Sequence, residues 1–209
     1  MLNSMKTVVA GLVLAGSQIA TAAVVLQIDI GNQLTGATGV QVGNLGIYDV
    51  AFVDGSCNSL FAGCSNAQFA FGSLANAAAA SQALFDQVFT DQALGNFDTE
   101  PERTAGCLTK GLCFVVTPYA IQLNSPGDNL VLTSIAANNG PSTGFADGVL
   151  GGGGQLLDYD TGLNPITTFA IWSRQGDVDT VPEPASLFLF GVALAGLARS
   201  CRRSLRSER

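Results

Sequence analysis

Apolar and polar residues alternate along several stretches of the chain, which is the pattern of a β-strand with one buried face. Residues 24–30 place their apolar side chains on one side, and residues 46–53 do the same before a turn-forming Asp-Gly pair. Three later stretches are rich in apolar, β-branched and aromatic residues, so we expect strands there as well: residues 112–123, 129–137 and 167–173.

A helical period replaces the strand period after Ser73. Apolar or small residues recur there at spacings of three and four, at Leu74, Ala77, Ser81, Leu84, Phe85 and Val88. Ser73 is a suitable N-cap, and Gly95 lies beyond the expected end. The alanines at residues 77–80 would let this helix pack closely on a sheet.

Residues 138–165 are rich in glycine, and we expect a long connection there, functional or mobile. The four glycines of residues 151–154 predict a flexible linker, because the Lys-Ser or Lys-Thr of a phosphate-binding loop does not follow them. Together these elements predict an α+β domain with a mostly antiparallel sheet of about five strands and one helix inserted after the second strand. A β-sandwich with an inserted helix is the alternative.

The first 23 residues have the features of a secretory signal peptide. Lys6 supplies a positive charge, residues 7–16 are apolar, and Ala20 and Ala22 form an A-x-A cleavage site. We therefore divide the chain into a signal helix (residues 1–23), an exported globular domain (residues 24–180) and a C-terminal segment (residues 181–209).

The exported domain is strongly acidic. It contains three basic and fourteen acidic residues, a net charge of −11, whereas the other basic residues lie at the two ends of the chain. Such a domain repels nucleic acid phosphates, which excludes a nucleic-acid-binding protein. The acids are best interpreted as solubilising a chain that has few charges.

Four cysteines lie in the exported domain, and an oxidising compartment favours two disulfides among them. Three pairings remain open. We favour the local pairs Cys57 with Cys64 and Cys107 with Cys113, because each closes a short segment that contains a turn-forming glycine. A cysteine-only zinc site is poorly supported, since no Cys-x-x-Cys pair is present.

The chain has no histidine, which removes imidazole-based nucleophile activation and acid–base catalysis. A glycosidase that uses two carboxylates needs none, and its candidate residues are Asp98, Glu100 and Glu102, or Asp158 with Asp160. The last two could also bind calcium, although the surrounding residues do not match an EF-hand loop. Acids beside prolines and glycines are more typical of solvated loops, so we predict no catalytic residue, metal or cofactor.

Four aromatic residues suggest a second hypothesis. Trp172, Tyr48, Tyr119 and Tyr159 could form a platform on which sugar rings stack, which would make the domain a polysaccharide-binding or adhesive module. Alternating aromatic residues in strands are more commonly part of a core.

The C-terminal segment has three parts in a fixed order. Pro182, Glu183 and Pro184 precede an uncharged apolar run at residues 185–198, and a basic cluster follows at Arg199, Arg202 and Arg203. As a helix the run extends about 21 Å, whereas the hydrocarbon core of a membrane is about 30 Å thick. It can span the membrane only if the flanking residues contribute, including arginines whose side chains extend to the headgroups. We expect a transmembrane helix with the arginines in the cytoplasm.

This order closely resembles the PEP-CTERM sorting signal of exported proteins in Gram-negative bacteria that make extracellular polysaccharide. The resemblance covers residues 181–209 and implies that an exosortase, a membrane-embedded sorting protease, recognises Pro182, Glu183 and Pro184 and removes the anchor. These residues are then a site that is acted upon. Two prolines suit this role because they hold the segment extended.

Together these features predict a non-enzymatic exported protein. Its precursor is anchored in the inner membrane, and its mature form belongs to the cell envelope or the extracellular space. The resemblance implies an association with polysaccharide-rich biofilm. A polysaccharide-binding module is the alternative function, and a carboxylate-dependent glycan hydrolase is the third.

Overall fold

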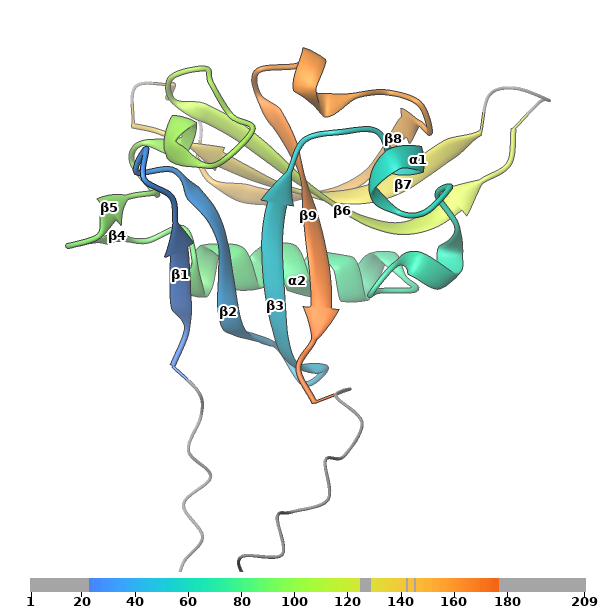
Figure 1. Ribbon diagram of the computed structural model, residues 1–209, viewed down its shortest axis with the longest axis horizontal. Helices are drawn as coiled ribbons and strands as arrows, with labels where there is room; N and C mark the ends of the chain where they lie inside the picture. The colour runs from blue at the N-terminus through green and yellow to red at the C-terminus, as the bar shows by residue number, and fades with distance from the viewer. Residues whose placement is uncertain (1–22, 125–128, 142, 145, 177–209) are drawn as a thin grey trace, which may run out of the picture.

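The alternating stretches form strands of one large sheet. The structure is a computed structural model that describes residues 23–124, 129–141, 143–144 and 146–176 (Figure 1). The large sheet has seven strands: β1 (Val25–Ile28), β2 (Leu34–Val42), β3 (Gly46–Val53), β6 (Leu112–Gln122), β7 (Leu130–Asn139), β8 (Gly148–Leu156) and β9 (Thr167–Arg174). A two-stranded ribbon joins β4 (Asp91–Gln92) to β5 (Gly95–Asn96).

The strands lie in the order β1-β2-β3-β9-β6-β7-β8, and every neighbouring pair except β6 with β9 is antiparallel. The last strand, β9, therefore lies in the middle of the sheet. Figure 1 shows a strong twist, in which β6, β7 and β8 run across the direction of β1, β2, β3 and β9. The expectation of a mostly antiparallel sheet is confirmed, but the number of strands is larger than the five expected. The described strands form one continuous large sheet and not the two sheets of a sandwich.

The expected helix is α2 (Leu74–Gln87), which begins directly after Ser73. The Ser73 side chain accepts a hydrogen bond from the Asn76 backbone N–H at 3.3 Å, as an N-cap does. Small residues and Leu84 line the buried face, so the helix packs closely against β2, β6, β7 and β8. The Ser81 and Ser134 hydroxyls are 3.0 Å apart in this contact, where each satisfies the other's hydrogen-bonding group.

The main hydrophobic core lies between α2 and one face of the sheet. It contains the alternating residues Tyr48, Val50 and Phe52 of β3, as the sequence pattern predicts. A smaller core lies on the opposite face, where Phe61, Phe69 and the Cys57–Cys64 disulfide cover Val116, Val131 and Phe169. The sheet is therefore covered on both faces in its central part.

Two strands of the large sheet were not expected. The strand β2 contains mostly small residues, and its alternation is interrupted by an irregular register between Ala37 and Val40. The strand β8 contains residues 151–154, so the interpretation of these glycines as a flexible linker is wrong. A Cβ atom at Gly153 would lie 3.0 Å from Ile135 Cδ1, and glycine therefore lets the side chains of β7 lie over β8.

Three short 3₁₀ helices and one short α-helix complete the secondary structure of the described residues. They are α1 (Cys57–Leu60), η1 (Asn66–Gln68), η2 (Pro101–Arg103) and η3 (Thr161–Leu163). All four lie in connections between strands or between a strand and α2, where the chain changes direction.

Candidate functional site

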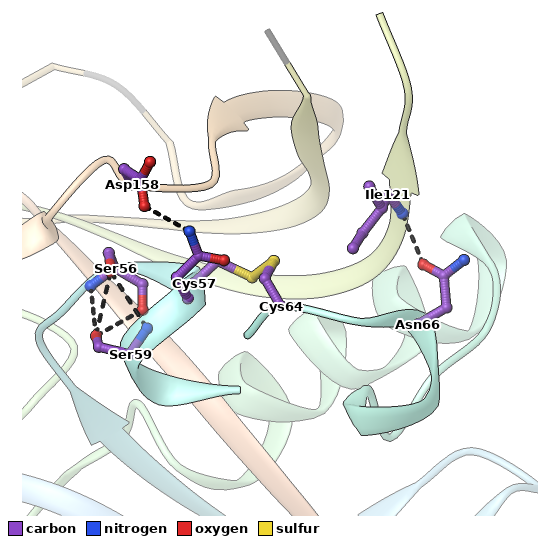
Figure 2. Close-up of a disulfide and its surroundings, with 8 residues drawn as sticks. Ser56, Cys57, Ser59, Cys64, Asn66, Ile121 and Asp158 are labelled. Atoms are coloured by element: carbon purple, nitrogen blue, oxygen red, sulfur yellow. Dashed lines mark hydrogen bonds between the residues drawn. A yellow bond between two sulfur atoms is a disulfide. The ribbon is translucent and has the colours of Figure 1, made fainter. Parts of the chain in front are cut away.

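The first disulfide holds residues 56–70, here called the covering segment, on the face of the sheet opposite the main core (Figure 2). Cys57 bonds to Cys64 with their Cα atoms 5.2 Å apart, which is the local pair that we favoured. Ser56 caps α1 by accepting a hydrogen bond from the Ser59 backbone, and the Ser59 side chain accepts one from the Ser56 backbone. A closed loop of this size contributes about 2 to 3 kcal/mol in the chain-entropy model.

Two polar contacts fasten this covering segment to distant parts of the chain (Figure 2). The Asn66 side-chain oxygen accepts a hydrogen bond from the Ile121 backbone N–H of β6 at 2.8 Å. The Asn58 side chain donates to Asp158 Oδ1 at 2.5 Å, in the connection that precedes η3. The segment is therefore held at both ends, and Asp158 serves as one of its attachment points.

The second disulfide, between Cys107 and Cys113, lies at the opposite side of the sheet and inside the main core. The two Cα atoms are 5.5 Å apart, and both cysteines are fully buried. Cys113 belongs to β6, and the backbone N–H groups of Leu108 and Thr109 donate to the Pro165 carbonyl just before β9. The bond thus fixes a loop next to the two central strands.

The four candidate aromatic residues do not form an exposed platform. Tyr48 and Trp172 lie in the main core, 5% and 8% exposed, with their rings edge to face at 6.4 Å between centroids. Tyr119 packs partly buried against the same core. Tyr159 is the most exposed of the four, and its hydroxyl accepts a hydrogen bond from the Asn164 side chain in a different part of the molecule. The structure therefore gives these rings mainly a packing role.

A hollow of about 330 Å³ lies beside Tyr48 and Trp172. It is lined by Tyr48, Ala67, Gln68, Phe69, Ala70, Trp172 and Arg174. Residues 67–70 supply one wall, and the strands β3 and β9 supply the other. Because the two large rings are buried, they offer almost no face for a stacked sugar.

The first group of candidate acids is divided among separate partners. Glu100 forms an ion pair with Arg103, and Glu102 accepts a hydrogen bond from the Gly111 backbone at 3.2 Å. Asp98 is hydrogen-bonded to the carboxyl group of Asp147, a residue that sequence reasoning did not consider. The three candidate acids therefore have separate structural partners, and none of these contacts joins two of the candidates.

Burial raises the pKa of Asp98 above its ordinary value, and the nearby negative charges of Asp147 and Asp91 raise the pKa further. A hydrogen bond between two carboxyl groups requires a proton on one of them. Asp91 uses its own carboxylate to accept hydrogen bonds from the Asp98 and Thr99 backbone N–H groups at 3.1 and 3.2 Å. The three acids therefore hold the β4–β5 ribbon together and attach it to the residue that precedes β8.

We expect the substitution Asp98→Asn to stabilise the protein at pH 7. The folded state holds the Asp98 proton more tightly than the unfolded state, so the charged form costs free energy at neutral pH. The asparagine amide can donate to Asp147 without that cost. The rise in Tm should shrink as pH falls through the raised pKa towards the ordinary value of 3.8.

Thermal unfolding followed by circular dichroism between pH 3 and pH 8 measures this effect. Asp86→Asn, at an exposed position on α2, is the matched control and should show no comparable gain. A lower Tm for Asp98→Asn at pH 7 would show that the carboxyl pair stabilises the fold instead.

The second group of candidate acids has local structural roles. Asp158 binds Asn58, as described above, and Asp160 Oδ1 accepts a hydrogen bond from the Gly162 backbone at 2.9 Å at the start of η3. Within the described residues, no three side chains of the types that ligate metals lie close enough together to hold an ion. The calcium hypothesis therefore has no geometric support from this turn.

Burial raises the pKa of Asp54, which follows β3 directly, and the hydrogen bond from the Thr161 hydroxyl partly offsets this effect. The Thr161 hydroxyl lies 3.2 Å from Asp54 Oδ1. This side chain ties the end of β3 to η3, and the negative charge of Asp160 close by raises the pKa of Asp54 slightly more. Sequence reasoning used Asp54 only as a turn signal.

The expected sorting residues lie outside the described residues, as do the apolar run and the basic cluster. The expected signal peptide also lies outside them, except for Ala23. Among the residues that the structure describes, no helix is long and apolar enough to cross a membrane. The structure does show where the chain leaves the fold, because Gln175 and Gly176 follow β9 at its exit from the sheet.

Comparison with protein families places a PEP-CTERM protein-sorting motif at residues 180–203. The match covers Pro182, Glu183 and Pro184, the apolar run, and the arginines through Arg203. The chain is therefore an exported protein targeted for sorting by an exosortase-type enzyme, with a precursor anchored in the membrane by its C-terminal segment. Comparisons with curated proteins and with solved structures give no match.

Proposed function

We propose that this chain is a non-enzymatic protein of the cell envelope or extracellular matrix in a polysaccharide-producing Gram-negative bacterium. An exosortase-type protease removes its anchor at Pro182, Glu183 and Pro184, and the folded domain is then released or transferred. The observation that carries this proposal is the sorting motif at residues 180–203 behind a separately folded domain.

Three features of the domain support the proposal. Its two disulfides suit an oxidising compartment outside the cytoplasm. The candidate acids have structural partners, as the Glu100–Arg103 ion pair illustrates. The absence of histidine leaves few routes to acid–base chemistry at neutral pH. The polysaccharide setting comes from the resemblance of the C-terminal segment, and polysaccharide is the partner we expect for the mature protein.

The experiment compares the wild-type chain with a variant in which Pro182, Glu183 and Pro184 are all replaced by alanine. Both are produced in cells that contain the sorting protease, and intact masses are measured in the membrane, envelope and medium fractions. We expect the wild type to end near Pro184 and the variant to keep its arginine tail. Reduction should add the mass of about four hydrogens to either form, as two disulfides require.

Equal processing of the two proteins would contradict the sorting role of these three residues. Hydrolysis of the producer's polysaccharide by the purified domain, lost in Asp98→Asn while the fold is intact, would contradict the non-enzymatic role. Binding of that polysaccharide without hydrolysis would instead support the alternative of a binding or adhesive module.

A further inference from the structure

The chain enters and leaves the folded domain at the same end. In Figure 1, β1 begins and β9 ends at the lower end of the molecule, beside the turn that joins β2 to β3. The register agrees, because Arg174 of β9 pairs with Tyr48 at the start of β3, immediately after that turn. We call this the proximal end, defined by residues 43–45 and by Arg174 and Gln175.

The fold holds the chain firmly up to Gln175. The strand β9 is hydrogen-bonded to β3 on one side and to β6 on the other. Beyond it, the Gln175 backbone N–H donates to the Ile47 carbonyl at 2.8 Å, and the Gln175 side chain donates to Asp49 at 2.5 Å. A force on the C-terminal segment therefore acts on an interior strand of the sheet.

Only a short tether separates this anchor from the sorting residues. Residues 176–181 lie between Gln175 and Pro182, so even a fully extended chain separates these two residues by about 25 Å at most. A folded domain of this size has a radius of gyration of about 15 Å, so its width exceeds the reach of the tether. The apolar run begins directly after Pro184, which keeps the sorting residues close to the membrane.

We propose, on the basis of the sorting function above, that the proximal end faces the membrane-embedded sorting protease and that the tether length limits access to Pro182, Glu183 and Pro184. The fold thereby limits the distance between the domain and the peptide that the protease must reach. The protease has to fit its cleft beneath the domain, between the β2–β3 turn and the membrane.

The first test changes the tether length in the full precursor and follows its conversion by pulse–chase labelling. We expect deletion of residues 176–179, which leaves the sorting motif at residues 180–203 intact, to slow conversion at least about tenfold, since misplacing a substrate by 1 Å can cost about 10²-fold. Replacing the same residues by glycine and serine keeps the length and should leave conversion unchanged. An insertion of about eight such residues after Gly176, which forms a flexible linker, should not slow conversion.

The second test places a photoreactive amino acid at one of two exposed positions and detects adducts with an epitope-tagged protease. Asn44 lies in the β2–β3 turn, and Leu163, 85% exposed, lies in η3 at the opposite end. We expect adducts from position 44 and none from position 163.

The outcomes separate this inference from the sorting function. If the wild type is converted and the triple alanine variant is not, the sorting function holds. In that case, rapid conversion of the deletion variant, or adducts from position 163 alone, would overturn the tether inference only. Failure of the wild type to be converted, or conversion of the triple alanine variant, would overturn the sorting function on which the inference depends.

Discussion

Replacing Trp172 by alanine should lower the free energy of unfolding by about 3 to 5 kcal/mol, as truncation of a buried tryptophan does. The indole packs against Tyr48 and Phe71 in the main core, with ring centroids 6.4 and 5.7 Å away. Its Nε1–H donates a hydrogen bond to the Thr117 hydroxyl at 3.2 Å, so truncation also removes the partner of a buried polar group. Urea unfolding of the mature protein measures the change. It is followed by far-ultraviolet circular dichroism, which does not depend on tryptophan fluorescence.

Trp172→Phe is the control, because it keeps an aromatic ring while it removes the indole N–H and only part of the buried ring volume. Leaving the Thr117 hydroxyl without its donor should cost about 1 to 3 kcal/mol, clearly less than the alanine variant. A loss below about 1 kcal/mol for Trp172→Ala would contradict the packing role. It would restore the hypothesis of a sugar-stacking residue, especially if polysaccharide binding were lost as well.

Gly106→Ala should be the other strongly destabilising change. Gly106 has φ of +86°, a backbone conformation that side chains with a Cβ atom rarely adopt. A Cβ there would lie 2.6 Å from the Thr168 hydroxyl of β9 and would also overlap the Asp54 carboxylate. The conformational cost and the overlap together predict a loss of about 2 to 5 kcal/mol in the free energy of unfolding.

Gly63→Ala separates the two causes. Gly63 has φ of +89°, but a Cβ there would have no atom within 4 Å, so only the conformational cost of about 1 to 2 kcal/mol remains. Denaturant unfolding of both variants gives the comparison. Equal losses for the two variants would show that Asp54 and Thr168 move aside, and that the contact at Gly106 does not constrain the fold.

Both predictions concern the strands that hold the anchor point of the tether. Trp172 lies on β9, and Gly106 contacts Asp54 after β3 and Thr168 on β9. Since β9 lies in the middle of the sheet, its packing maintains the attachment of the C-terminal segment during sorting. A destabilised variant should therefore reach the membrane in a form more exposed to proteolysis.

The local pattern of the sequence was sufficient for several elements. Strict alternation in β3 and the Ser73 cap of α2 predicted both elements, because each signal acts within a few residues. The two disulfide pairs follow the local pairing that was favoured, although the number of cysteines alone left three pairings open. The sorting motif was predictable for the same reason, since its three parts follow one another directly along the chain.

The acids and the aromatic residues needed the tertiary structure. Asp98 and Asp147 are far apart in the sequence, and nothing local to either residue indicates that their carboxyl groups are hydrogen-bonded. The strand pattern around Trp172 fits either a core strand or a binding face, and only the packing of Phe71 and Tyr48 against its ring decides that it is buried.

The sequence by itself determined the route of this protein and its most regular elements, because export signals, strand alternation and helix caps are read from neighbouring residues. Only the tertiary structure decided that β2 and β8 exist, since their small residues and glycines gain strand conformation from β3 and β7 beside them. It also decided that β9 lies between β3 and β6, a placement set by packing across the whole sheet. The antiparallel pairing of β9 with β3 brings the end of β9 to the end of the domain where β1 begins, so the C-terminal segment leaves the fold there (Figure 1).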